Sequence, residues 1–155
     1  MKILFVCTGN TCRSPMAELV LKTLAKEREL TVVCESAGLS TDRIGQPANP
    51  KAIQVEAARG YKPESHQSRS VAEVELLDFD LIVGMTKDHV LRLKKLMPEA
   101  EASRVHHFMY FVPGQDGQDL VDPYGGTLKD YEYALDLIEV GCDTLVAKLS
   151  RDDRL

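Results

Sequence analysis

The residues of this chain best suited to chemistry lie in one short loop near the N-terminus. Residues 7–14 read Cys-Thr-Gly-Asn-Thr-Cys-Arg-Ser and follow the apolar residues 3–6. A cysteine sulfur is nucleophilic as the thiolate, which positive charge and a helix N-terminus both stabilise. Arg13 follows Cys7 by six residues, and its planar guanidinium matches the oxygen atoms of a phosphoryl group. The pattern therefore indicates a cysteine nucleophile directed at a phosphate.

The elements on either side of this loop would shape it into an anion site. Residues 3–6 are expected to form a short buried strand, and Ser14 and Pro15 suit the N-cap and first position of a helix. Backbone N–H groups at such a junction point toward a bound anion, with the helix dipole behind them. The residues expected to surround the phosphate are Thr8, Gly9, Asn10, Thr11 and Cys12. The Ser14 hydroxyl can also donate a hydrogen bond to the thiolate.

Other interpretations of the loop fit less well. A Walker loop ends in Gly-Lys-Ser/Thr and a dinucleotide fingerprint needs three glycines, whereas this loop contains only Gly9. Nucleotide binding is therefore not indicated. A cysteine that ends a buried strand is, on its own, more often a small core residue than a nucleophile. The combination of Cys7 with Asn10, Arg13 and Ser14 favours catalysis.

Size, charge and cysteine content limit the possible functions. The chain has 155 residues and 44% hydrophobic content, which fits one domain over residues 1–155. A formal charge of −5 argues against general binding to nucleic acid or membranes. No segment approaches the ~20 apolar residues of a membrane helix, and no signal peptide is expected. Four scattered cysteines without histidines at zinc-ligand spacing favour a cytoplasmic protein, with neither a metal nor a cofactor expected.

The rest of the chain alternates between strands and helices. Apolar periodicity predicts strands at residues 3–6, 31–35, 80–84 and 105–108, and helices at 15–29, 50–58, 71–77, 87–97 and 128–149. The first strand, helix and strand predict a parallel βαβ unit, with the anion loop at the carboxyl end of its first strand. Open α/β sheets bind their ligands there. The tail, residues 151–155, is expected to fray.

A long loop late in the chain supplies a candidate acid. Residues 111–126 contain four glycines and two prolines, and Asp122 precedes Pro123. The proline holds Asp122 extended, which suits a carboxylate projected over a pocket from a rigid turn. Alone it would be an ordinary turn aspartate. A cysteine phosphatase, however, needs an acid to protonate the leaving group and then a base for water, and Asp122 is the candidate.

Three further residues keep two interpretations each. Ser36 either braces the anion loop or is a turn serine. His66, considered alone, is a surface histidine or one that supports a site from behind, rather than a catalytic base. Cys12 either packs in the core or forms a reversible disulfide with Cys7, five residues away. Such a disulfide would protect the nucleophile from irreversible over-oxidation.

Taken together, these motifs resemble the low-molecular-weight protein tyrosine phosphatase family. The resemblance spans essentially the whole chain and rests on residues 7–14, 36–38 (Ser-Ala-Gly), 65–68 (Ser-His-Gln-Ser) and 122–124 (Asp-Pro-Tyr). It implies an α/β three-layer sandwich of the phosphotyrosine protein phosphatase I-like (Rossmann-like) type, in which a four-stranded parallel sheet carries helices on both faces. It also implies metal-free hydrolysis through a phosphocysteine.

The resemblance assigns a role to each matching residue. Cys7 would be the nucleophile, Arg13 would bind the phosphoryl oxygens, and Asp122 would be the general acid and base. Ser14 would stabilise the thiolate, and Tyr124 would line the substrate site. The residues matching positions that hold the loop are Asn10, Ser36 and His66.

Two positions resemble the protein arginine phosphatase branch of this family. Members acting on phosphotyrosine usually carry a branched aliphatic residue where this chain has Thr11, and a second aromatic where it has Gly125 after Tyr124. A threonine hydroxyl suits a polar guanidinium, and loss of an aromatic wall weakens stacking on a phenyl ring. We therefore predict phosphoarginine as the substrate, with phosphotyrosine as the alternative. Phosphorylated proteins would be the partners of a monomeric enzyme.

Three other functions are weighed against hydrolysis. An arsenate reductase would need further cysteines on a mobile segment, and residues 78–89 contain none. A phosphocysteine carrier of sugar transport passes its phosphoryl group on, and so has no use for Asp122 as an activator of water. A non-catalytic anion-binding module would not need the intact nucleophile. Steady hydrolysis of a simple aryl phosphate would separate a phosphatase from the last two.

Overall fold

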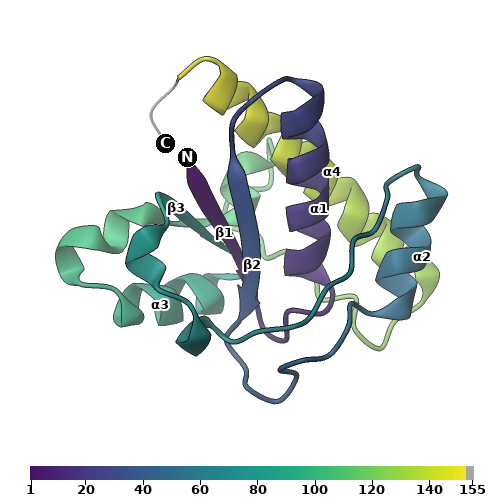
Figure 1. Ribbon diagram of the computed structural model, residues 1–155, viewed down its shortest axis with the longest axis horizontal. Coiled ribbons are helices and arrows are strands. Elements are labelled where there is room, and N and C mark those ends of the chain that lie inside the picture. Colours follow the sequence, from purple (N-terminus) through teal and green to yellow (C-terminus); the bar gives the residue numbers. More distant parts are fainter. Residues whose placement is uncertain (153–155) are drawn as a thin grey trace.

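The computed structural model describes residues 1–152, which form a four-stranded sheet between two layers of helices (Figure 1). The strands are β1 (Lys2–Cys7), β2 (Val33–Gly38), β3 (Leu81–Gly84) and β4 (Val105–His107). They lie in the order β2-β1-β3-β4, and every neighbouring pair is parallel. The predicted parallel sheet and βαβ unit are confirmed.

Helices cover both faces of the sheet because its strands are apolar on both sides. The helices are α1 (Arg13–Glu27), α2 (Pro50–Ala58), α3 (Lys87–Leu96) and α4 (Leu128–Ser150). Along β1, Ile3 and Phe5 enter a core shared with α1, α2 and α4, while Leu4 and Val6 enter a second core on the side of α3. This alternation is the period of two expected of a strand. The predicted three-layer α/β sandwich is therefore confirmed.

The first helix begins earlier than predicted. Arg13 is its first residue and Cys12 its N-cap, whereas the sequence suggested Ser14 as the cap and Pro15 as the first helical position. The reason is that the Ser14 hydroxyl contacts the sulfur of Cys7 instead of capping the backbone. The cap position itself makes no side-chain hydrogen bond.

Apart from shifts of one residue at an end, two other elements differ from their predicted ranges. β2 runs two to three residues later, because residues 36–38 pair with residues 5–7 of β1. The predicted helix over 71–77 is two one-turn 3₁₀ helices, Val71–Glu73 and Leu76–Asp78, since Val74 between them is extended. Further 3₁₀ turns cover Glu99–Arg104 and Phe108–Phe111. In the predicted fraying tail, residues 151–152 form a turn, and residues 153–155 lie outside the described part.

No helix within residues 1–152 combines the length and the apolar character needed to cross a bilayer.

Gly141 lies inside α4 at a point where a side chain would collide with the core. A Cβ atom there would lie 2.5 Å from Cζ of Phe108, a buried ring. Alanine normally favours a helix over glycine by about 1 kcal/mol, but the overlap should outweigh that gain. We expect Gly141→Ala to lower the free energy of unfolding in urea by about 1–3 kcal/mol.

The exposed neighbour Val140 supplies the control for this change. Val140→Ala should alter the free energy of unfolding by no more than about 0.5 kcal/mol. A Gly141→Ala protein as stable as the parent would show that Phe108 moves aside at no cost.

Candidate active site

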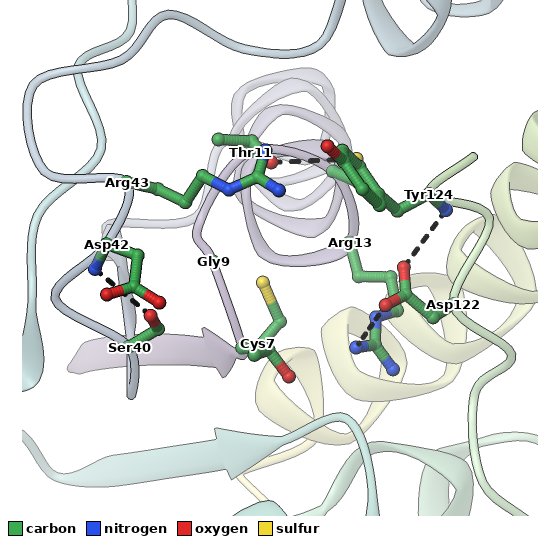
Figure 2. Close-up of a pocket in the computed structure, with 11 residues that line it drawn as sticks. Cys7, Gly9, Thr11, Arg13, Ser40, Asp42, Arg43, Asp122 and Tyr124 are labelled. Carbon is green, nitrogen blue, oxygen red and sulfur yellow. Dashed lines mark hydrogen bonds and ion pairs between the residues drawn. The ribbon is translucent and has the colours of Figure 1, made fainter.

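A pocket of about 180 Å³ opens beyond the carboxyl end of β1 (Figure 2). Its lining residues are Cys7, Thr8, Gly9, Thr11, Cys12, Arg13, Ser40, Asp42, Arg43, Asp122 and Tyr124. The pocket thus brings the N-terminal loop together with the Asp-Pro-Tyr turn from the far end of the sequence. The three residues predicted to be catalytic, Cys7, Arg13 and Asp122, all line it.

The start of α1 is suited to holding an anion. Its N-cap, Cys12, makes no side-chain cap bond, and the first turn contains no acidic residue. The first N–H groups of the helix are therefore not taken up by a side chain, and the helix dipole is not offset there. Asn10 adopts a left-handed backbone (φ 56°) that folds the loop back, and its N–H lies 3.3 Å from the Cys7 sulfur.

The sulfur of Cys7 has a second donor in Ser14. The Ser14 Oγ atom lies 2.9 Å from Cys7 Sγ and accepts a hydrogen bond from Asn10 Nδ2, also at 2.9 Å. Its own proton is therefore available to the sulfur, since the alternative acceptor, the Ala37 carbonyl, is farther away at 3.5 Å. Ser14 and the Asn10 N–H therefore both direct hydrogen-bond donors at the Cys7 sulfur.

Asn10 is the centre of a network that holds the loop. Its side chain donates to Ser36 Oγ at 2.9 Å and accepts from the Arg69 N–H at 3.1 Å. The backbone carbonyl of Asn10 accepts from Ser68 Oγ at 2.9 Å and from His66 Nε2 at 2.7 Å. Because a carbonyl can only accept, His66 must carry its proton on Nε2. Ser36 and His66 therefore both hold the loop through hydrogen bonds with Asn10.

The glycine of the Ser-Ala-Gly motif is required by close packing. A Cβ atom on Gly38 would lie 2.7 Å from the Thr8 carbonyl oxygen and 3.0 Å from the Asn10 nitrogen. The end of β2 therefore lies directly against the backbone of the loop, and a larger residue would displace it.

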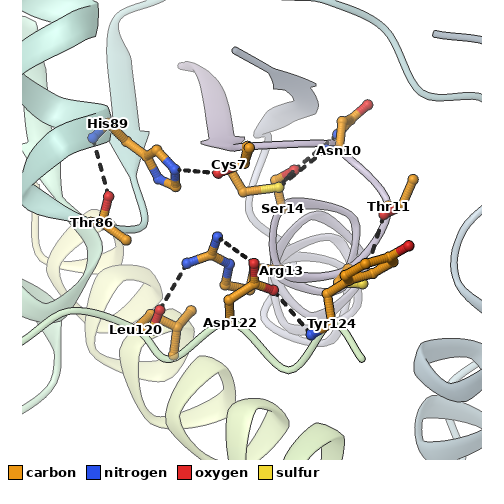
Figure 3. A network of polar contacts seen from close by, with 12 residues as sticks. Cys7, Asn10, Thr11, Arg13, Ser14, Thr86, His89, Leu120, Asp122 and Tyr124 are labelled. Carbon is orange, nitrogen blue, oxygen red and sulfur yellow. Dashed lines mark hydrogen bonds and ion pairs between the residues drawn. The ribbon is translucent and has the colours of Figure 1, made fainter. Parts of the chain in front are cut away.

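Arg13 connects the loop to the Asp-Pro-Tyr turn (Figure 3). Its nearly buried guanidinium donates to the Leu120 carbonyl at 2.9 Å and forms an ion pair with Asp122 at 3.4 Å. The Asp122 carboxylate also accepts from the Tyr124 N–H at 3.1 Å, and its side chain is 51% exposed. The arginine is thus fixed in the floor of the pocket, while the carboxylate stands at its mouth.

Several pocket residues carried no sequence signal. Ser40, Asp42 and Arg43 come from the stretch after β2, in which the sequence predicted neither a strand nor a helix. The Arg43 guanidinium lies over the ring of Tyr124, 4.4 Å from its centroid. His89, in the first turn of α3, contacts Thr8. Nothing in the spacing of these residues could have identified them, because the path of the chain after β2 and the order of the strands bring them to the loop.

The second cysteine of the loop is kept as a neutral thiol. Burial is the main cause that raises the pKa of Cys12, and its sulfur lies 3.5 Å from the Tyr131 hydroxyl. All four cysteines are free and buried, and a regulatory disulfide between Cys7 and Cys12 stays a prediction. Across the described residues, no three His, Cys, Asp or Glu side chains come close enough to hold a metal ion.

Comparison with known proteins agrees with this geometry. The family model "Low molecular weight phosphotyrosine protein phosphatase" matches residues 2–155. The low molecular weight protein-tyrosine-phosphatase YfkJ of Bacillus subtilis is 31% identical, covering 100% of this chain and 99% of that protein. A protein-arginine-phosphatase of the same organism is 33% identical, with coverages of 99% and 100%. The crystal structure of a protein tyrosine phosphatase from Entamoeba histolytica superposes with a TM-score of 0.92 at 33% identity, covering 98% of each chain.

Proposed function

The chain belongs to the low molecular weight phosphotyrosine protein phosphatase family, and we propose that its substrate within that family is phosphoarginine on proteins. The family is one of cysteine-dependent protein phosphatases. Relatives named for tyrosine, at 31% to 37% identity, and relatives named for arginine, at 33% and 34%, do not separate the two substrates. The choice between the two substrates therefore rests on the residues of the pocket.

The polar lining of the pocket is the observation that carries the proposal. Among the described residues that line it, Tyr124 is the only aromatic side chain, and none is aliphatic. Thr11 contributes a hydroxyl to this lining, and Asp42 and Asp122 contribute carboxylates. A guanidinium is planar, cationic and rich in N–H donors, so these acceptors suit it better than a phenyl ring.

The stacking of Arg43 on Tyr124 supports the same substrate. The guanidinium lies 4.4 Å from the ring centroid at the rim of the pocket (Figure 2). Aromatic faces attract guanidinium groups through the ring quadrupole. We infer that the guanidinium of a bound substrate stacks on the Tyr124 ring in the same manner.

The site residues account for both steps of hydrolysis. The Cys7 thiolate attacks phosphorus and forms the S–P bond, while Arg13 and the loop N–H groups hold the phosphoryl oxygens. Asp122 gives its proton to the departing guanidine nitrogen as the P–N bond breaks. The resulting carboxylate then takes a proton from water, which attacks the phosphocysteine. Inorganic phosphate leaves, and the thiolate and the protonated Asp122 are restored.

Phosphotyrosine is the second candidate. The exposed ring of Tyr124, 52% accessible, can also stack on a phenyl group. The chemistry would be unchanged, except that Asp122 would protonate a phenolic oxygen.

The two substrates are distinguished by kcat/KM on a phosphoarginine peptide and a matched phosphotyrosine peptide, with Cys7→Ser as the blank. We expect phosphoarginine to be preferred. Thr11→Ile should shift the ratio toward phosphotyrosine by about 10-fold, because it replaces a hydrogen-bonding wall with an apolar one. Thr41→Ile, an equal change on an exposed residue outside the pocket, should leave the ratio unchanged. Preference of the parent protein for phosphotyrosine would overturn the proposal.

We further propose that the enzyme works on phosphorylated proteins in a reducing compartment, the cytoplasm. All four cysteines are free thiols in the structure, including the proposed nucleophile. A thiolate enzyme of this kind stays active only while its cysteine is kept reduced.

A further inference from the structure

His89 is a buried histidine that contacts the catalytic loop from the side of α3 (Figure 3). Its side chain is 3% exposed, and its Nε2 atom lies 2.9 Å from the Thr8 hydroxyl oxygen. Its backbone N–H donates to the Thr86 hydroxyl at 3.1 Å, which fixes the first turn of the helix. Thr8, by contrast, is exposed and lines the pocket beside Cys7. The contact therefore joins a buried ring to a hydroxyl at the pocket surface.

The imidazole is neutral at physiological pH. Burial is the main cause that lowers the pKa of His89 to about 4, and the positive charge of Arg13 acts in the same direction. Among the other charged groups around the ring, Arg92 also lowers this pKa, while Asp88 and Asp119 raise it. Because the ring is neutral near pH 7 and does not line the pocket, His89 is not placed to transfer protons to the substrate. Its possible role is that of a fixed hydrogen-bonding partner.

The surroundings of Nδ1 indicate which nitrogen of the neutral His89 ring carries its single proton. Within residues 1–152, the Nδ1 atom of His89 is buried and has no hydrogen-bond partner. A buried N–H without an acceptor is rarer than a buried lone pair without a donor. The proton therefore resides on Nε2, which donates to the Thr8 oxygen. The proton of the Thr8 hydroxyl is then left for donation to an acceptor other than His89.

We propose that the Thr8 hydroxyl donates a hydrogen bond to a phosphoryl oxygen of the bound substrate, and that His89 is a positioning residue that fixes the direction of this hydroxyl. Phosphoryl oxygens are strong acceptors, and a donor held in place before the reaction stabilises charge that develops on them. A neutral ring suits this task, because it orients Thr8 without adding a second cation beside Arg13. The inference rests on the phosphatase chemistry and not on which phosphoamino acid is the substrate.

A double-mutant cycle separates this role from simple packing. Thr8→Val removes the hydroxyl, and His89→Leu removes the group that orients it. Each is expected to lower kcat/KM on an aryl phosphate by about 10-fold and to raise the inhibition constant of inorganic phosphate by a similar factor. The double variant should lose about the same 10-fold, because both changes remove one hydrogen bond. Multiplication of the two losses to about 100-fold would overturn the proposal.

Conservative variants and a pH profile provide the second test. Thr8→Ser and His89→Gln keep the hydroxyl and an N–H donor, and should restore most of the activity. The kcat/KM profile of His89→Gln should keep the shape of the parent profile between about pH 5 and 8, because His89 does not titrate there. Loss of one limb of the profile would show a proton-transfer role instead.

The test remains decisive if His89→Leu does not fold. An unchanged phosphate inhibition constant in Thr8→Val would by itself overturn the proposal, since the hydroxyl would then not touch the phosphoryl group. Aryl phosphate and inorganic phosphate are common to both candidate substrates. Failure of this inference is therefore distinguishable from failure of the phosphoarginine assignment.

Discussion

Replacing Cys7 by serine is expected to abolish turnover while leaving the fold intact. A serine hydroxyl has nearly the size of the thiol but is not ionised near neutral pH. The hydrogen bonds from Ser14 and from the Asn10 N–H would then stabilise an anion that does not form. We expect kcat on an aryl phosphate to fall by about 10⁴-fold or more.

Two measurements accompany this result. Rapid quenching and mass spectrometry should detect a phosphorylated Cys7 in the parent enzyme during turnover, and Cys7→Ser should show no repeated release of phosphate. Cys34→Ala is the matched control, because Cys34 is a buried cysteine of β2 that does not line the pocket. It should keep kcat within a few-fold of the parent value. Substantial turnover by Cys7→Ser would rule out Cys7 as the nucleophile.

The sequence predicted those site residues that lie close together along the chain. The loop over residues 7–14 combines a strand end, small polar residues and a Ser-Pro helix start, and all of these signals are local. The structure places Cys7, Arg13 and Ser14 in one pocket or directly against it. The exact helix start was wrong because Ser14 contacts a sulfur rather than the backbone, and a cap pattern carries no information about that choice.

The part that the sequence did not predict depends on the order of strands. β3 lies directly beside β1, so the first turn of α3 reaches the loop and His89 meets Thr8. In the sequence, His89 is one polar residue in an ordinary amphipathic helix. The range of β2 was misjudged for a similar reason: residues 36–38 are strand only because β1 pairs with them. Pairing between distant segments is not encoded in local propensity.

The residues at the rim of the pocket could not be predicted from the sequence either. Asp42 and Arg43 lie in an irregular stretch whose path is set by contacts at both ends, such as the Gly45 N–H to the Ser68 carbonyl at 2.7 Å. No periodicity describes such a stretch. Asp122, which does line the pocket, was nevertheless predicted as a site residue, because the chemistry of a phosphocysteine demands an acid and the Asp-Pro turn offers one.

Asp122→Asn is expected to reduce activity in a manner that depends on the leaving group. A departing guanidine or phenol must be protonated as its bond to phosphorus breaks, and an amide cannot supply that proton. We expect kcat/KM on phosphoarginine or phosphotyrosine peptides to fall by about 10²–10⁴-fold. The loss on p-nitrophenyl phosphate should be much smaller, since nitrophenolate leaves without a proton. kcat should still fall there, because the water that attacks the phosphocysteine needs a base.

The ion pair between Asp122 and Arg13 offers a competing explanation, which the same experiment tests. If the carboxylate only positions Arg13, with which it pairs at 3.4 Å, its loss would weaken phosphate binding equally for every substrate. In that case kcat/KM would fall by one common factor, and no phosphocysteine would accumulate. If Asp122 transfers protons, the intermediate should build up during turnover of p-nitrophenyl phosphate and be trapped by acid quench. Asp116→Asn, an exposed change in the same loop but outside the pocket, should behave as the parent enzyme in both assays.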